Sequence, residues 1–297
     1  MLTSVVIAGY NEEENLSDCV ESLIVQDCKR LEIILVDDGS VDSTLTLMGR
    51  LKEKYSTKKS SRVIKVISQS HRGPGVARNN GVSRATGSII VFVDADMTFA
   101  GDFISELVKP IVSNPGKVNG TSSSNEKFSN PGSVIAMCWN IGRFAAAGVY
   151  SARVKSEIIP IKQEFGGIFR AIKRSEFIRV GGFDSDGDYA DDLSLSRKLG
   201  YGAYPANSAI LFHKNPSTIS DMLVRAKWIG SSRQFTGGYF AKLASLFKYS
   251  FPLSIINAIF VSMMFRYWQF IPFKIFYDFL IFITVLRSFM SVKIRSL

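Results

Sequence analysis

The chain has 297 residues, 46% of them hydrophobic, which is enough for a well-buried core in one large domain with an appendage or in two modest domains. The net charge of +10 is uneven, since residues 216–297 hold ten basic and two acidic residues and the first 215 residues carry only +2. Because the basic excess lies in a very apolar part of the chain, it favours a membrane surface as the partner and argues against nucleic acid. The three cysteines have no metal-ligand spacing, which predicts free thiols in a reducing compartment.

The N-terminal part of the chain alternates between short apolar runs and segments with helical spacing. The apolar runs are rich in β-branched residues, so they are predicted to be buried strands: Leu2–Ala8, Leu31–Val36, Val63–Ile67 and Ser88–Val93. The first of them has no basic leader and runs into three glutamates, which predicts a strand and not a signal peptide. Helices are predicted between the strands, over Asn11–Val25, from Asp42 or Ser43 to Tyr55, and up to Arg84. We therefore expect an α/β fold with a Rossmann-like, mostly parallel sheet flanked by helices.

Polar residues follow three of these strands at the point where each strand ends. Tyr10-Asn11-Glu12 follows the first strand, Asp37-Asp38 the second, and the pair Asp94 and Asp96 the fourth. In parallel sheets ligands bind beyond the carboxyl ends of the strands. The sequence therefore predicts a nucleotide site at this edge.

The residue types at this edge suit a nucleotide that carries a metal. Two carboxylates on either side of Ala95 can meet one divalent cation and one ribose, and the cation can bridge the phosphates of a donor. A carboxylate at Asp38 can accept a hydrogen bond from the N–H of a base. Arg72 and Arg78 lie on the loop and helix before the fourth strand, where a guanidinium can meet a diphosphate, and Arg78 is favoured.

The C-terminal third begins with regular structure and ends in apolar segments. A short helix is expected near Ser175–Val180, an acidic stretch opens a helix that ends at Leu199, and a last strand over Ser208–Phe212 leads into His213. Ser250–Phe265 has no charge and Phe270–Met290 is mostly apolar, whereas a spanning helix needs about 20 apolar residues. We expect a basic amphipathic linker or interfacial segment over 216–249 and a membrane segment of one or two C-terminal hydrophobic helices over 250–297. A buried helical pair in a soluble protein is the alternative.

Four motifs, in this order along the chain, resemble family 2 glycosyltransferases of the GT-A fold. They are Val5–Glu12, Val36–Ser40 with Asp42 and Thr44, Gly75–Asn79, and Phe92–Asp96. The similarity covers about residues 3–215, which predicts a nucleotide-sugar-binding catalytic domain over 1–215. The resemblance implies that Ala8, Tyr10 and Asp38 contact the nucleoside, with Glu12 in the same motif. It further implies that Arg78 contacts the diphosphate, Asp94 the ribose and the metal, and Asp96 the metal.

The second half of this region also resembles the family. Gly166–Arg170 and Gly181–Asp184 are similar to its acceptor-side segment, and Ala190–Leu193 is similar to its Glu-Asp pair, with Asp191 where Glu is usual. The resemblance places the catalytic base on Asp192, with Asp191 near enough to take the same role. His213 follows the last strand, where the fold sometimes supplies a further metal ligand, and a packed or capping histidine is the equal alternative.

Two departures from the family pattern narrow the predicted reaction. The segment Val224–Trp228 lacks the Gln and Arg of the Gln-x-x-Arg-Trp motif of processive members, which favours transfer of one sugar. The acidic pair favours a hydroxyl acceptor over the phosphate acceptor of polyprenyl-phosphate sugar synthases, since a phosphate needs no base. We thus predict an inverting glycosyltransferase on the cytoplasmic face of a membrane. It would use a UDP- or GDP-linked sugar, Mg²⁺ or Mn²⁺, and a lipid-linked or glycan acceptor.

Three other functions are weighed against this one. A polyprenyl-phosphate sugar synthase and a catalytically inactive membrane scaffold that keeps the fold both remain open. A sugar-phosphate nucleotidyltransferase would need a glycine-rich basic loop after the first strand. The chain has the acidic Glu12-Glu13-Glu14 there, which would repel a triphosphate.

Overall fold

The computed structural model describes residues 1–56, 62–123, 125–146, 168–184, 191–231 and 238–294. For residues 191–193, 228–231 and 288–294 the description covers the backbone alone. The chain forms two compact units, the first from Met1–Lys127 and Pro160–His213 and the second from Phe128–Ile159 and Lys214–Leu297. The predicted division into a catalytic domain, a linker and a membrane segment is a functional one and stays a prediction.

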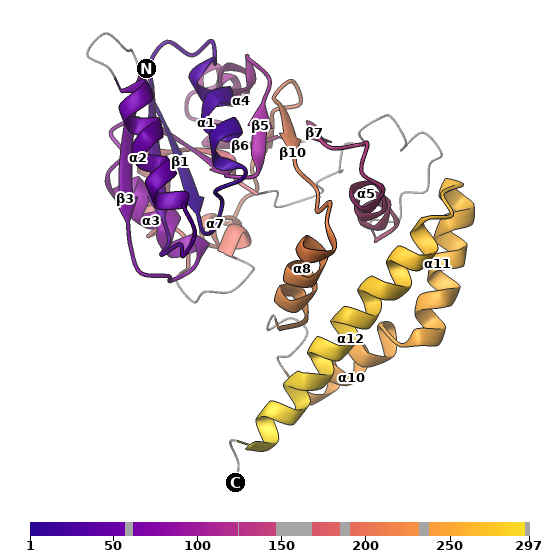
Figure 1. Ribbon diagram of the computed structural model, residues 1–297. Helices are drawn as coiled ribbons and strands as arrows, with labels where there is room; N and C mark the ends of the chain where they lie inside the picture. The colour runs from indigo at the N-terminus through magenta and orange to yellow at the C-terminus, as the bar shows by residue number, and fades with distance from the viewer. Residues whose placement is uncertain (57–61, 124, 147–167, 185–190, 232–237, 295–297) are drawn as a thin grey trace. The chain divides into compact units, whose positions relative to one another are not determined.

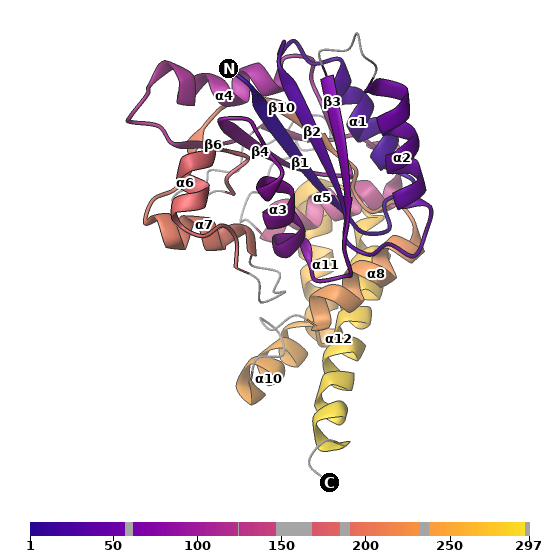
Figure 2. The ribbon, with the colours of Figure 1, turned by 90° about the vertical axis from the view of Figure 1, so that its left-hand side faces the viewer.

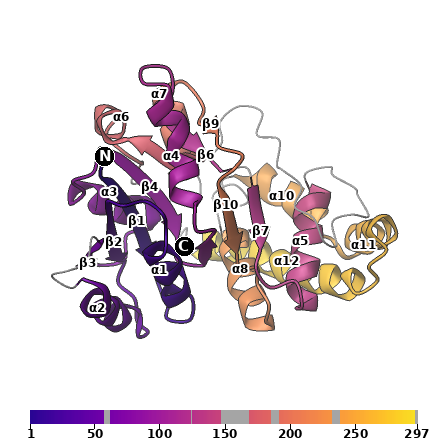
Figure 3. The same ribbon diagram turned by 90° about the horizontal axis from the view of Figure 1, so that it is seen from above.

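The first unit is built on a seven-stranded sheet with the order β3-β2-β1-β4-β8-β6-β9 (Figures 1 and 3, where β8 carries no label). The four predicted strands form its parallel part: β1 (Thr3–Gly9), β2 (Leu31–Asp37), β3 (Arg62–Ser68) and β4 (Ile89–Asp94). Three strands that the sequence did not reveal extend it: β8 (Ala171–Lys173), β6 (Gly120–Ser122) and β9 (Tyr204–Pro205). Only β8 runs antiparallel to its two neighbours, so the expected mostly parallel sheet is confirmed.

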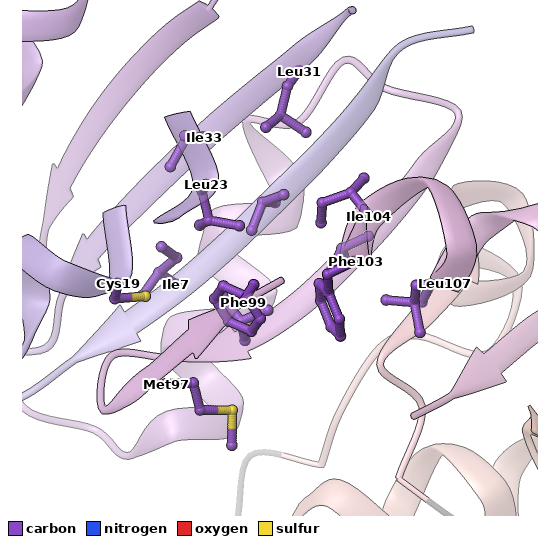
Figure 4. Close-up of a cluster of buried hydrophobic side chains, with 14 of the residues drawn as sticks. Ile7, Cys19, Leu23, Leu31, Ile33, Met97, Phe99, Phe103, Ile104 and Leu107 are labelled. Atoms are coloured by element: carbon purple, nitrogen blue, oxygen red, sulfur yellow. The ribbon is translucent and has the colours of Figure 1, made fainter. Parts of the chain in front are cut away.

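Helices cover both faces of this sheet, and successive strand residues point to opposite faces. Val5 and Ile7 pack into a core with the first set of helices: α1 (Leu16–Ile24), α2 (Thr44–Tyr55) and α4 (Phe103–Ser113). Figure 4 shows part of this core, where the ring centroids of Phe99 and Phe103 lie 4.6 Å apart. Val6 packs into the other core with the second set: α3 (Pro74–Ser83), α6 (Arg174–Arg179) and α7 (Asp191–Leu199). Burial of both faces explains the continuous apolar runs Val5–Ala8, Ile33–Val36 and Ile89–Val93 within β1, β2 and β4.

A second, three-stranded sheet has the order β5-β10-β7, and its strands are labelled in Figure 1. Its strands are β5 (Met97–Phe99), β10 (Ile210–His213) and β7 (Asn125–Phe128). The predicted strand over Ser208–Phe212 is β10, whereas the other two strands were not predicted. β10 pairs antiparallel with β5, and His213 lies opposite Met97. This register brings the end of β10 next to Asp96.

The second unit is helical (Figures 1 and 2). Its described helices are α5 (Val134–Ala146), α8 (Ile219–Ser231), α10 (Tyr239–Lys248), α11 (Phe251–Phe265) and α12 (Phe270–Ile294). The two C-terminal helices correspond to the two predicted apolar segments, and α12 packs along the other four. Within the described residues no single helix combines the length and the apolar character needed to cross a membrane. The pair α10 and α11, which is bent by 52°, meets those criteria only when taken together.

Candidate functional site

The polar residues at the ends of β1, β2 and β4 lie at one edge of the sheet. The parallel register places Ala8 of β1 beside Val36 of β2 on one side and beside Asp94 of β4 on the other. Gly9 lies beside Asp37 in the same register. The structure thus brings together the three strand ends that the sequence singled out.

Hydrogen bonds join the loop after β1 to the loop after β2. Asn11 adopts a left-handed backbone conformation with a φ of 58°. Its backbone N–H donates to Ser40 Oγ at 3.0 Å, and its side-chain oxygen accepts from the N–H of Val41 at 2.9 Å. The backbone N–H of Glu12 donates to Thr44 Oγ1 at 2.7 Å, and the Glu12 carboxylate accepts from Asn15 Nδ2 at 2.9 Å. These contacts give Asn11 and Glu12 a role in fixing the loop.

The Tyr10 ring lies against His71, with centroids 4.2 Å apart and planes at 33°. Both side chains are about half exposed, at 43% of the residue surface for Tyr10 and 56% of the side chain for His71. Exposed aromatic rings of this kind offer a surface on which a base can stack. His71 had no predicted role, although its place just after the third strand was a usable signal.

Asp38 is buried and holds the loop that follows β3. Its carboxylate accepts hydrogen bonds from Gln69 Nε2 at 2.7 Å and from the backbone N–H groups of Arg72 and Gly73 at 3.0 and 2.9 Å. His71 Nδ1 lies 3.0 Å from Asp38 Oδ2. Since a carboxylate has about four acceptor positions, much of its capacity serves the protein itself. The structure therefore shows Asp38 shaping this side of the site, and its predicted contact with a base stays a prediction.

Asp94 lies between two arginines. Its Oδ1 is 2.8 Å from Arg78 Nη2, and its Oδ2 is 3.1 Å from Arg170 Nη1. Burial opposes ionisation of Asp94, but the nearby Arg170 and Arg78 outweigh it and hold the pKa of the carboxyl well below its usual range. The Arg78 guanidinium also lies 5.6 Å from the centroid of the Phe183 ring. Two guanidinium groups beside one carboxylate leave a local positive charge, which suits a diphosphate.

Asp96, His213 and Glu126 form a chain across the second sheet. His213 Nε2 lies 3.0 Å from Asp96 Oδ2, and His213 Nδ1 lies 3.0 Å from Glu126 Oε1. Burial disfavours the charged imidazole, but its hydrogen bonds to Asp96 and Glu126 prevail and raise the pKa of His213 to about 9. Sequence reasoning missed Glu126, because its strand is short and carries no motif.

Asp96 and His213 fit two coordination positions of a divalent metal. Two ligand atoms bound at right angles, at about 2.1 Å from an ion, are about 3.0 Å apart, which matches their separation. Among the described residues no group of three or more His, Cys, Asp or Glu side chains could hold an ion by itself. A metal here would need further ligands from a bound phosphate, and the part predicted for Asp94 in metal binding stays a prediction.

The turn before α7 is tied to the helix that carries Arg78. Asn79 of α3 donates from Nδ2 to the carbonyl of Phe183 and accepts from its N–H, both at 2.9 Å. Helix α7 begins at Asp191. The side chains of Asp191 and Asp192 lie outside the described part, so their predicted roles stay predictions.

Comparisons with known proteins identify what this chain is similar to. Residues 4–144 match the family model described as glycosyl transferase family 2. An uncharacterized glycosyltransferase, YibD of Escherichia coli (strain K12), is 39% identical over 93 residues, which are 31% of this chain and 25% of that protein. The poly-beta-1,6-N-acetyl-D-glucosamine synthase of Staphylococcus aureus (strain COL) is 25% identical over 258 residues, which are 84% of this chain and 59% of that protein. The chain thus spans much less than the whole length of these relatives.

A solved structure supports the fold. The mannosyltransferase PcManGT from Pyrobaculum calidifontis, in complex with GDP-Man and Mn²⁺, has a TM-score of 0.60 to this chain at 21% sequence identity. The match covers 96% of this chain and 86% of that one. The expected GT-A fold is therefore confirmed. The matched segment holds all four motifs at the sheet edge, so residues 4–144 of this chain are similar to glycosyl transferase family 2.

Proposed function

We propose that the protein is an inverting glycosyltransferase that moves one sugar from a UDP- or GDP-linked donor to a hydroxyl group. The observation that carries this proposal is the cluster at the sheet edge, where Arg78 and Arg170 meet Asp94 and where Asp96 meets His213. It combines cations for a diphosphate with a carboxylate and an imidazole for a divalent metal. The match of residues 4–144 to glycosyl transferase family 2 and the GT-A fold support the same function.

Donor binding is assigned to the described residues as follows. The Tyr10 and His71 rings provide the stacking surface for the base, next to the loop that Asp38 holds. Arg78 binds the diphosphate, and Asp94 meets the ribose while it orients Arg78 and Arg170. A divalent cation held by Asp96 and His213, Mg²⁺ or Mn²⁺, would neutralise charge on the leaving diphosphate when bound.

The acceptor side completes the reaction. The acceptor hydroxyl passes its proton to the Asp192 carboxylate while its oxygen attacks the anomeric carbon, and the bond from that carbon to the diphosphate oxygen breaks with inversion. The start of α7 at Asp191 supports this role, because it puts the acidic pair at a helix N-terminus after the turn that Asn79 holds. Asp191 is the alternative base.

A hydroxyl acceptor on a lipid-linked or other glycan is proposed because an acidic pair is present where a phosphate acceptor would need none. Transfer of one sugar is proposed because Val224–Trp228 departs from the processive motif. A polyprenyl-phosphate sugar synthase is the alternative enzyme, and an inactive scaffold is the alternative without catalysis.

The second unit is proposed to hold the enzyme on a membrane, with the first unit on the cytoplasmic face. Helix α10 buries polar residues and exposes aromatic ones, which is the reverse of the usual pattern for a helix on the surface of a soluble protein. Lys242 and Ser245 are buried, while Phe240 and Phe247 are 83% and 72% exposed. An apolar face of this kind suits a lipid interface. Serine at both phenylalanines of the full chain should reduce binding to anionic phospholipid vesicles. Serine at Val41, which is 85% exposed in the first unit, should not. Equal binding by all three proteins would refute the proposal.

Calorimetry with UDP, GDP and their sugar conjugates, in Mn²⁺ and in chelator, tests the donor site. We expect metal-dependent binding of one nucleotide class. Asp96→Asn should abolish the metal dependence, whereas Asp192→Asn should leave donor binding near normal and remove transfer. Equal loss of donor binding in both variants would contradict the role given to Asp192, and no binding of any nucleotide by folded protein would favour the scaffold.

A further inference from the structure

We propose that Glu126 is a positioning residue for the metal site, which it serves by holding His213 in the orientation and tautomer that ligation requires. This inference rests on the proposed metal-assisted function and extends it to a residue that no motif marks. Glu126 itself contacts neither the metal nor the donor in this proposal.

The three side chains come from the second sheet and its border. Glu126 lies on β7, His213 ends the central strand β10, and Asp96 directly precedes β5. Their side chains are 25%, 20% and 16% exposed, respectively. Because the order of strands is β5-β10-β7, the imidazole is held from both sides by carboxylates of its neighbours.

The chemistry of imidazole explains why the second carboxylate matters. A neutral imidazole carries one proton, and only its other nitrogen can bind a metal. The Glu126 carboxylate, 3.0 Å from Nδ1, accepts the proton of that nitrogen. Nε2 is then left with its lone pair directed to the side of Asp96. A carboxylate behind a ligating histidine fixes the ring and makes it a better ligand.

The hydrogen-bond geometry around His213 also shows that Glu126 supports the imidazole and is not itself placed as a ligand of the metal. Glu126 Oε1 is bonded to Nδ1, whereas Asp96 Oδ2 is bonded to Nε2. These two nitrogens direct their in-plane bonds away from each other. An ion placed between Asp96 and Nε2 therefore lies on the opposite side of the ring from Glu126.

The test compares Glu126→Gln with His213→Ala and with Glu106→Gln in the full chain. Glu106 is a matched control, because its side chain is also 25% exposed and pairs with one partner, Lys109, at 3.0 Å. Binding of Mn²⁺ is measured by electron paramagnetic resonance and calorimetry in the presence of UDP or of GDP. Nucleotide affinity in chelator and the melting temperature are measured in parallel.

We expect Glu126→Gln to weaken Mn²⁺ binding by about 10- to 100-fold, while its nucleotide affinity in chelator and its melting temperature stay within the range of the control. The nitrogen coupling of an imidazole in the Mn²⁺ spectrum should be present in the wild type and absent in His213→Ala. Glu126→Asp, which keeps the carboxylate, should recover part of the lost Mn²⁺ affinity.

Wild-type Mn²⁺ affinity in Glu126→Gln would overturn the inference and leave the proposed function standing. A parallel fall of metal affinity, metal-free nucleotide affinity and melting temperature would also overturn it, since that pattern shows a merely structural role. Absence of Mn²⁺ and nucleotide binding in the wild type would overturn both the inference and the proposed function.

Discussion

Gly81→Ala should destabilise the protein, although the residue lies in a helix. Gly81 belongs to α3, and a Cβ built there would lie 2.4 Å from Val6 Cγ1 and 3.1 Å from Val36 Cγ2. Carbon atoms in contact prefer about 3.5–4.0 Å, and both valines are fully buried in the sheet. Either α3 or the sheet must therefore move by about 1 Å.

The expected size follows from two opposed effects. Overpacking of a core costs about 1–3 kcal/mol, and replacing glycine by alanine in a helix returns up to about 1 kcal/mol. We expect a net loss of about 1–2 kcal/mol, which corresponds to about 2–4 °C in melting temperature for each kcal/mol in a domain of this size. Because Arg78 lies one turn earlier on the buried face of the same helix, its 2.8 Å contact with Asp94 should also weaken and lower donor affinity.

Gly49→Ala is the matched control for this prediction. Gly49 lies inside α2, and a Cβ there would meet no atom within 4 Å. The same substitution should therefore stabilise the protein by about 0.5–1 kcal/mol. Urea and thermal unfolding of both variants, with nucleotide calorimetry, provide the measurement. If the two variants shift stability in the same direction, the steric argument for Gly81 is wrong.

Two further predictions concern buried polar networks of the first unit. Burial disfavours the charge on Glu32, but Lys65 and hydrogen bonds from Ser4 and Thr86 prevail and lower its pKa. The ionised Glu32 carboxylate stabilises the folded protein above its unfolded pKa of about 4.3, and this stabilisation is lost as pH falls through its folded pKa. Glu32→Gln should therefore lower the free energy of unfolding by about 1–3 kcal/mol at pH 7. The loss should become progressively smaller below pH ~4.3 when unfolding is measured as a function of pH. Asn79→Ala removes the hydrogen bonds that hold the turn at Phe183, so it should lower kcat about 10- to 100-fold with little change in donor affinity. Steady-state kinetics that show weaker donor binding with an unchanged kcat would contradict this.

The local sequence was sufficient for the parallel half of the fold and for its binding edge. The strands β1, β2 and β4 each contain a continuous apolar run because both faces of the sheet are covered, and such runs can be recognised without knowledge of the partner. Each ends in a polar or turn residue, and the parallel arrangement alone requires the ends to meet. The strand ends after Ala8 and Val36, and Asp94 at the end of its strand, were therefore predictable.

The short strands were not predictable from the chain. β8, β6, β5 and β7 have three or four residues each, which is too short for a periodic signal, and they exist only because longer elements offer them partners. The contacts that these strands make were equally hidden. Arg170 directly precedes β8 and reaches Asp94 from there.

The amino-acid sequence was enough to predict the α/β class, the family resemblance and the set of charged residues at the carboxyl edge of the sheet. Which of these residues face one another depends on the packing and pairing of distant elements. Asp96 and His213 are 117 positions apart, and Glu126 lies between them in the chain, 87 positions before His213. They meet because antiparallel pairing of β10 with β5 fixes the register at His213 and Met97. Sheet register is a long-range property of hydrogen-bonded neighbours, so no local pattern in the chain encodes it.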